Sequence, residues 1–254
     1  IMVVYAFSTA AGDFTLENFA RMGTYTAVFT RSFKLAIIAT LIALLIGYPV
    51  SYMLSKEGPQ VQRIAMVLIM LPMWMNFLLR TYSWMSILEN NGLLNQLFQQ
   101  IGLIDLYNQI AMHFASDPAA YVPIDHFQMI GTQGAVVLGM VYNYLPFMIL
   151  PIYSVLVKLD HSLIEAARDL GASSVQVFRK VILPLSLPGV LSGITMVFVP
   201  SVSTFAISRL LGGGTQMMLG DLIEQQFLGG AYNPQLGAAI ALVMMAIVVV
   251  CICL

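Results

Sequence analysis

Apolar runs long enough to cross a lipid bilayer dominate this chain. The hydrocarbon core of a bilayer takes about 20 residues of α-helix, so each such run predicts one membrane-spanning helix. Five runs meet this length, and they lie at residues 35–54, 64–88, 135–156, 185–207 and 236–254. The pattern therefore predicts an all-α polytopic transmembrane helix bundle with five full spans.

Proline residues interrupt several of these runs. A proline lacks an amide N–H, and the carbonyl that it leaves free in lipid needs a partner on a neighbouring helix or a polar side chain. The interrupting residues are Pro72, Pro146, Pro151, Pro188 and Pro200. We therefore expect a packed bundle that forms a single transmembrane domain over residues 1–254.

Both ends of the sequence and two polar stretches add detail. Residues 1–7 form an apolar stub that predicts the tail of a further N-terminal helix, and the apolar end at Leu254 predicts a further polar C-terminal segment. Apolar residues at helical spacing over 93–101 predict a short amphipathic helix on the outer surface. Residues 15–33 are interpreted as a helix that leads into the first span.

Composition and charge exclude an ordinary soluble domain and set an orientation. The chain is 59% hydrophobic and 9% charged, whereas about a quarter of the residues of a soluble domain are charged. The outer loop 89–134 contains acidic residues and no Lys or Arg, while Arg21, Arg31 and Lys34 on that side weaken the bias. Six of the eleven basic residues lie in the two segments assigned to the cytoplasm, namely Lys56, Arg63, Lys158, Arg168, Arg179 and Lys180.

The sequence shows no chemistry of its own that could supply energy. The glycine triplet 212–214 is followed by Thr215 rather than by the Lys of a phosphate-binding loop. His113, His126 and His161 are isolated, and Cys251 and Cys253 fall on different helix faces, so no metal site or disulfide is suggested. We expect no catalytic residue, metal or cofactor in this chain and an energy source in a partner chain.

The polar segment 159–184 between the third and fourth runs predicts a helix, a tight turn and a second helix on the cytoplasmic face. Ser162 and Glu165 have capping-box spacing, Gly171 is placed as a helix stop, and Ser173 or Ser174 can cap a second helix. Pro184 is expected to help end that second helix. The plain alternative is an ordinary loop in which Glu165 only caps a helix.

The same segment resembles the coupling-loop signature of ABC importer permeases. The matching residues are Glu165, Ala166, Ala167, Gly171, Ile182, Leu183 and Pro184. The resemblance implies a MetI-like type I importer fold in a bacterial inner membrane, with the loop docked on a dimer of ABC ATPase subunits that bind ATP and Mg²⁺. It also makes Arg168 a surface contact for the ATPase.

Further stretches at 71–85, 142–151, 210–214 and 220–227 are similar to the B-subunit type of spermidine/putrescine permease. That similarity implies polyamine import with a second permease of C type and an extracytoplasmic polyamine-binding protein. It implies lipid and protein partners and no nucleic acid. The alternatives are an ABC permease for another small solute such as an inorganic anion, an ion-gradient-driven secondary transporter and, least supported, an intramembrane enzyme.

Polar and aromatic residues toward the outer half of the spans form the candidate substrate path. Aromatic faces and carboxylates suit a flexible polycation, although Trp and Tyr also gather at membrane interfaces regardless of function. We expect polar bands at Asn76, Arg80 and Ser83, at 142–144 and at 201–204 to face a shared cavity. We expect Arg80 and Arg209 to pair with Asp221, Glu224 or carbonyls. The candidates are Trp74, Asn76, Arg80, Tyr82, Trp84, Tyr142, Asn143, Ser203, Asp221 and Glu224.

Overall fold

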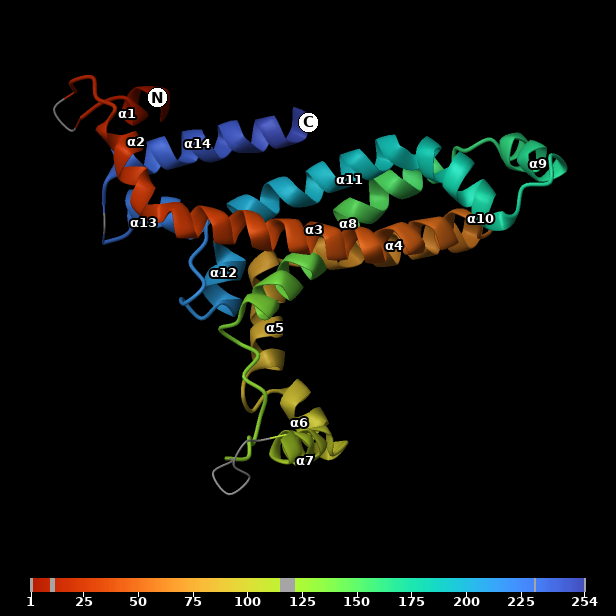
Figure 1. Ribbon diagram of the computed structural model, residues 1–254, viewed down its shortest axis with the longest axis horizontal. Helices are drawn as coiled ribbons and strands as arrows, with labels where there is room; N and C mark the ends of the chain where they lie inside the picture. The colour runs from red at the N-terminus through yellow and green to blue at the C-terminus, as the bar shows by residue number, and fades with distance from the viewer. Residues whose placement is uncertain (1, 10–11, 115–121, 231, 254) are drawn as a thin grey trace.

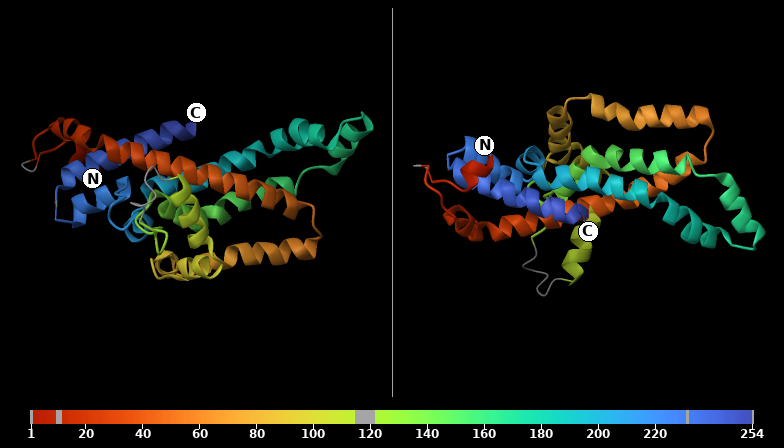
Figure 2. Two further views of the ribbon diagram at one scale, coloured as in Figure 1. Left: turned by 60° about the horizontal axis from the view of Figure 1, so that its bottom comes forward. Right: turned by 90° about the horizontal axis from the view of Figure 1, so that it is seen from above.

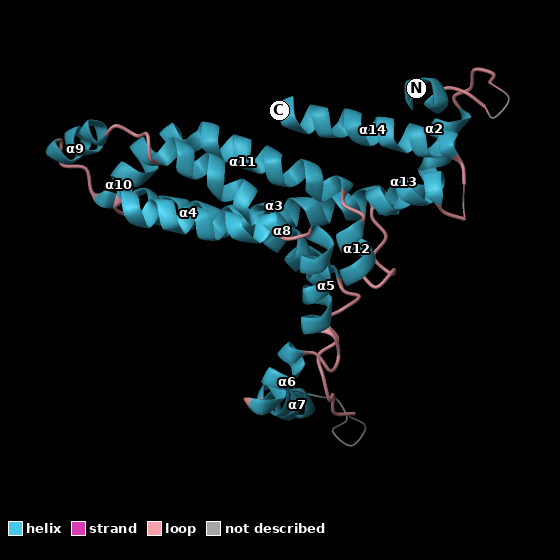
Figure 3. Ribbon diagram, turned by 180° about the vertical axis from the view of Figure 1, so that it is seen from behind, coloured by secondary structure: helices cyan, strands magenta, loops and turns pink. Residues whose placement is uncertain are grey.

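A computed structural model of the chain describes residues 2–9, 12–114, 122–230 and 232–253. Every named element in these ranges is a helix (Figure 3), which confirms the predicted fold class. Four helices run lengthwise through the molecule (Figure 1): α3 (Thr26–Ser55), α4 (Pro59–Trp74), α8 (Gln133–Leu156) and α11 (Leu183–Ser203). A fifth long helix, α14 (Pro234–Cys253), lies beside α1 (Met2–Ala6) and α13 (Leu219–Leu228).

Small residues allow α3, α8 and α11 to pack closely. A Cβ atom at Gly47 would lie 2.9 Å from Met148 Cγ, and a Cβ at Gly189 would lie 2.8 Å from the Pro151 carbonyl oxygen. The Ser51 hydroxyl, beside Gly47 on α3, donates to the Ile149 carbonyl on α8 over 3.1 Å. Without a hydrophobic force between helices in lipid, such backbone proximity is the main source of helix association.

The spans agree with the hydrophobic pattern except at two places. Within the described residues, four helices are long and apolar enough to cross a membrane, or five if one bent pair counts as a single span. The first is continuous from Glu17 through α2 (Glu17–Arg21), η1 (Met22–Tyr25) and α3, which confirms the predicted lead-in helix. The third and last runs agree with α8 and α14 to within two residues.

The second run is not one continuous span, which corrects the prediction. It contains α4 and α5 (Phe77–Leu88), and the axis of Pro59–Trp74 is bent by 89° from that of the helical segment Phe77–Gln100, which begins with α5. Met75 takes an extended conformation after Pro72, and the Asn76 side chain then caps α5 by accepting a 2.8 Å hydrogen bond from the Leu78 N–H. The break therefore has a proline before it and a new N-cap after it. Figure 2 shows α4 standing to one side of the bundle, and α4 has no buried residue.

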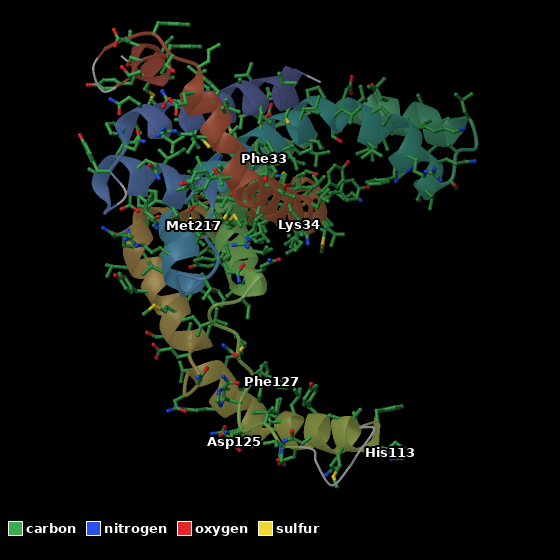
Figure 4. The ribbon with its side chains drawn as sticks, turned by 60° about the vertical axis from the view of Figure 1, so that its left-hand side comes forward. Phe33, Lys34, His113, Asp125, Phe127 and Met217 are labelled. Atoms are coloured by element: carbon green, nitrogen blue, oxygen red, sulfur yellow. The ribbon has the colours of Figure 1, made fainter. Side chains whose placement is uncertain are left out.

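The arm beyond α5 projects sideways from the bundle. It contains α6 (Leu93–Gln100), which confirms the predicted amphipathic helix, and α7 (Leu103–Phe114), which was not predicted. The buried Asn95 side chain holds the arm together, because it donates to the Phe127 carbonyl over 3.1 Å and accepts from the Phe127 N–H over 3.0 Å. Figure 4 shows Asp125, Phe127 and His113 at the far end of this arm, away from Lys34 and Met217 in the bundle.

The fourth run also differs from its prediction at both ends. Its helix begins at Ser174, as α10 (Ser174–Val177) and the π-turn η2 (Phe178–Ile182) run without interruption into α11. It ends at Ser203 because Thr204 is extended, and a separate helix α12 (Ala206–Leu211) follows. The remaining helix, α9 (His161–Asp169), lies at the end of the bundle opposite to α13 (Figure 1).

Candidate functional site

The helical hairpin α9–α10 begins with a cap other than the one predicted. Asp160 is the N-cap of α9, and its Oδ1 accepts a 2.9 Å hydrogen bond from the Ser162 N–H. Ser162 and Glu165 therefore do not form the start of the helix, since Asp160 already binds a free amide of its first turn. Glu165 is instead exposed on the middle of α9. The plain interpretation of Glu165 as a helix cap is wrong.

Gly171 ends α9 as predicted. Its φ angle is +81°, a left-handed conformation that favours glycine. The Gly171 N–H donates to the Arg168 carbonyl over 2.8 Å, and the Ala172 N–H donates to the Ala167 carbonyl over 3.1 Å. This pair of hydrogen bonds is a Schellman motif, which satisfies the last carbonyls of the helix and fixes the turn.

The second helix of the hairpin begins as predicted but does not end at Pro184. The Ser173 side chain accepts from the Gln176 N–H, and the Gln176 side chain accepts from the Ser173 N–H over 2.8 Å. The helix then continues, because the Leu183 N–H bonds to the Phe178 carbonyl five residues earlier. A proline ring clashes with the carbonyl one turn back in a regular α-helix, so the wider π-turn accommodates Pro184.

The hairpin has an anchored inner face and an exposed outer face. Ile182 and Val177 are buried against Ile152 and Leu156 of α8, with Ala167 packed against the same cluster. The exposed face of the hairpin, which points away from the bundle, carries both polar and apolar residues, namely Leu163, Glu165, Ala166, Arg168 and Leu170. Leu170 is 89% exposed at the tip. Leu163 and Leu170 therefore leave apolar surface exposed on this hairpin.

The hairpin lies at the same end of the bundle as the turn between α3 and α4, as the charge pattern predicted. A cavity of about 340 Å³ is lined by Tyr52 from α3, by Lys56, which caps the end of α3, and by Ile164 and Arg168 from α9. Phe178 in the π-turn packs edge-on against Tyr52, with ring centroids 5.5 Å apart. These contacts connect the hairpin to α3 as well as to α11.

At the opposite end, α12 and α13 are joined through a buried carboxylate. The Ser208 hydroxyl donates to Asp221 Oδ2 over 2.6 Å, and the Met218 N–H donates to the same oxygen over 2.9 Å. Burial raises the pKa of Asp221 above its ordinary value, against the lowering effect of these hydrogen bonds. Asp221 lies in the first turn of α13, and its hydrogen bonds hold α12 and α13 together.

Glu224, on the same helix, binds Arg209 as predicted. Arg209 Nη1 lies 2.8 Å from Glu224 Oε2 and 2.9 Å from Oε1. Both predicted acidic residues of the substrate path thus have partners within this chain in the conformation described. Their role toward a substrate stays a prediction.

The aromatic and polar candidates differ in their exposure and in their contacts among the described residues. Trp84 on α5 and Tyr142 on α8 meet edge-on with ring centroids 5.3 Å apart. Trp74 is 76% exposed at the end of α4, and Tyr82 is 48% exposed. Asn76 caps α5, while Ser203 and Ser83 donate to carbonyls of their own helices. Of Asn76, Arg80 and Ser83, which were predicted to form one stripe, only Arg80 is buried within this chain.

Arg80 is buried without a partner for two of its nitrogen atoms. Its exposed fraction is 9%, and Nε and Nη1 have no hydrogen-bond acceptor among the described residues. The predicted pairing of Arg80 with Asp221 or Glu224 is therefore not observed. Asn143 is 2% exposed. Its Oδ1 atom also has no hydrogen-bond partner among the described residues, although its Nδ2 donates to the Gly139 carbonyl.

The sequence did not predict the roles of three residues. Ser208 stabilises the α12–α13 end of the bundle, and Phe178 and Asp160 stabilise the hairpin end. A signal existed for Asp160, since an Asp directly before an amphipathic stretch is a strong N-cap. Ser208 and Phe178 gave no comparable signal, because their partners come from other helices. Their roles depend on the tertiary fold.

An all-helical membrane bundle that presents a rigid helical hairpin at one end has the architecture of a transport permease. Residues 39–254 match the family described as binding-protein-dependent transport system inner membrane component, and the chain belongs to this family. It is therefore a multi-pass membrane protein and a permease subunit of such a transport system.

Characterised relatives agree with this assignment. The spermidine/putrescine transport system permease protein PotB of Salmonella typhimurium (strain SL1344) is 38% identical over 217 residues, which are 85% of this chain and 69% of the relative. PotB of Escherichia coli (strain K12) is also 38% identical over 85% of this chain and covers 72% of that protein. A crystallised bacterial ABC transporter that imports the acidic polysaccharide alginate matches 98% of this chain and 85% of its own, with a TM-score of 0.70 at 17% identity. That likeness shows the fold.

Proposed function

We propose that this chain is the translocating subunit of a polyamine importer, which moves spermidine or putrescine inward by alternating access. The observation that carries the proposal is the 38% identity, over 85% of the chain, with spermidine/putrescine permeases. Sequence identity at this level over most of a chain is much stronger support for a shared substrate class than a shared fold.

The energy for transport comes from a partner in this proposal. An ABC ATPase dimer binds ATP and Mg²⁺ and docks on the outer face of the hairpin, where Glu165, Arg168 and Leu170 are exposed. Movement of the hairpin reaches the spans directly, because α10, η2 and α11 form one helix of 30 residues from Ser174 to Ser203. A second permease of C type and an extracytoplasmic polyamine-binding protein complete the importer.

The substrate contacts belong to the outer half of the bundle. Trp84 and Tyr142 offer paired aromatic faces for the methylene chain and for cation–π contact with ammonium groups. Asp221 and Glu224 provide carboxylates if the outer helices separate during the transport cycle. Trp74, Asn76, Tyr82, Asn143 and Ser203 complete the proposed path.

An inorganic-anion permease is the second candidate, and the Arg80 Nε and Nη1 atoms, which have no acceptor among the described residues, favour it. Arg209 does not, since Glu224 already neutralises it. Competition separates the two functions. Uptake of labelled spermidine should fall with excess putrescine and stay unchanged with excess phosphate or sulfate.

The direct test is reconstitution of the chain with its second permease, ATPase and binding protein in proteoliposomes. We expect spermidine influx that requires ATP and Mg²⁺ and that Glu165→Ala lowers at least several-fold. Gln60→Ala, an exposed change at the start of α4 on the same side, is the matched control. Uptake without ATP, driven by an ion gradient, would contradict the proposal and support a secondary transporter.

A further inference from the structure

Arg80 places an uncompensated positive charge deep inside the bundle. Its side chain is nine-tenths buried, and its Nε and Nη1 atoms are shielded from solvent without a partner among the described residues. An arginine cannot lose its proton in a protein, so the group stays charged. At the outer end, by contrast, Glu224 binds Arg209, and Asp221 accepts hydrogen bonds from Ser208 and Met218.

The charge acts at the middle depth of the bundle. Arg80 lies within electrostatic reach of the Tyr144 side chain, which hydrogen-bonds Thr204. Tyr144 is the twelfth of the 24 residues of α8, counted from Gln133, and Thr204 follows the last residue of α11. Three elements, α5, α8 and the end of α11, therefore converge on this point. An ionised side chain at such a depth marks a transport pathway by default.

A buried lone cation is unsuited to hold a cationic substrate, but it is suited to exclude one. In pores, a fixed positive charge in a surrounding of low dielectric constant opposes the passage of cations. An importer of polycations needs such an obstacle, since an inside-negative potential of 100 mV favours inward movement about fifty-fold for each elementary charge.

We propose that Arg80 is the electrostatic barrier that keeps this permease closed to cations when the ATPase is idle. The inference rests on the polyamine function proposed above. Because α5 joins α4 only through the two non-helical residues Met75 and Asn76, α5 can carry Arg80 away from Tyr144 when the transport cycle opens the path. The substrate then passes a point from which the movement of α5 has removed the charge of Arg80.

The test measures leak in proteoliposomes that contain the complete importer without ATP, under an inside-negative potassium diffusion potential set with valinomycin. Influx of labelled spermidine and of tetramethylammonium is recorded separately. Arg80→Gln should raise both at least tenfold, whereas Arg80→Lys keeps the charge and should stay within about twofold of wild type. Arg209→Gln removes an exposed arginine that Glu224 neutralises and should not leak.

Thr204→Asp covers the case in which Arg80→Gln fails to assemble. It adds a carboxylate beside Tyr144 and compensates the guanidinium, so it should leak while Arg80 is retained. Absence of leak in both Arg80→Gln and Thr204→Asp would overturn the proposal. Equal leak in Arg80→Gln and Arg80→Lys would do so too, because packing rather than charge would then close the path. If spermidine proves not to be a substrate, tetramethylammonium influx still reports on the barrier, so the two failures are distinct.

Discussion

The hydroxyl of Ser208 donates a 2.6 Å hydrogen bond to Asp221 Oδ2, across 13 residues of sequence and two helices. The Met218 N–H donates to the same oxygen. One carboxylate thus connects α12 to the start of α13 at the outer end of the bundle. This connection makes Asp221 a structural residue in the conformation described, whatever contact it makes with a substrate.

Replacement of Asp221 should separate its hydrogen bonds from its charge. Asp221→Ala leaves the Met218 N–H unpaired and limits the Ser208 hydroxyl to its other acceptor, the Phe205 carbonyl, so it should lower the free energy of unfolding by about 1–3 kcal/mol. Asp221→Asn keeps an acceptor oxygen and should cost much less. Thermal unfolding of the purified complex in detergent measures both. Equal loss of stability in the two variants would contradict the structural role.

The raised pKa of Asp221 also predicts a pH dependence. The folded protein holds this proton more tightly than the unfolded chain does, so the stabilising contribution is complete below the ordinary pKa of 3.8 and is lost as pH rises through the raised pKa. The unfolding temperature of the wild type should therefore fall relative to that of Asp221→Asn over this rise in pH. A difference between the two that is independent of pH would show that burial does not perturb this group.

The hydrophobic pattern was sufficient to predict the fold class but not the break in the second span. Pro72 did not distinguish a break from a tolerated proline, because Pro146, Pro151, Pro188 and Pro200 all lie inside continuous helices. The distinguishing feature is Asn76, whose side chain starts a new helix. An N-cap residue shortly after a proline is therefore the more informative signal.

The two ends of the bundle differed in how well they could be predicted. In the hairpin, the Gly171 stop and a cap at Ser173 or Ser174 depend on neighbours in sequence, and both predictions were correct, whereas the predicted start of α9 and the predicted end at Pro184 were wrong. At the outer end, the contact between Ser208 and Asp221 and the burial of Arg80 depend on how separate helices pack. Part of the local chemistry was therefore readable from the sequence, and the tertiary contacts of the outer polar groups were not.

Gly171→Ala tests the proposed transmission through the hairpin. A Cβ at this position would meet no atom within 4 Å, so the cost is limited to the left-handed backbone, about 1–2 kcal/mol. The turn should relax and the number of ATP molecules hydrolysed per spermidine imported should rise several-fold. Gly58→Ala is the control, since Gly58 has an ordinary φ of −67° and equally open space. Unchanged coupling in Gly171→Ala would show that the turn conformation does not matter.

Gly189 tests the close packing of α11 on α8. Gly189→Ala places a Cβ 2.8 Å from the Pro151 carbonyl oxygen and 3.1 Å from the Ile152 Cα, and backbone atoms cannot move aside cheaply. We expect a loss of about 1–3 kcal/mol in stability. Gly134→Ala on α8 meets only Thr132 Oγ1 at 3.7 Å and should be neutral or stabilising. The melting temperatures of the two purified complexes measure this difference in stability. A Gly189→Ala variant as stable as Gly134→Ala would contradict the packing argument.

The π-turn at Phe178–Ile182 predicts that Pro184 sets the orientation of the hairpin relative to α11. Pro184→Ala restores an amide N–H and removes the ring, so a regular α-helical turn becomes possible. Loss of the one extra residue in the π-turn would rotate the hairpin about the axis of α11 by about 100°. Spin labels at the exposed positions Leu170 and Val61 report this rotation as a changed distance distribution. Pro188→Ala, inside regular α11, is the matched control and should leave the distances unchanged. If both variants keep the wild-type distribution, the π-turn is stabilised by the packing of Phe178 against Tyr48 and Tyr52 rather than by Pro184.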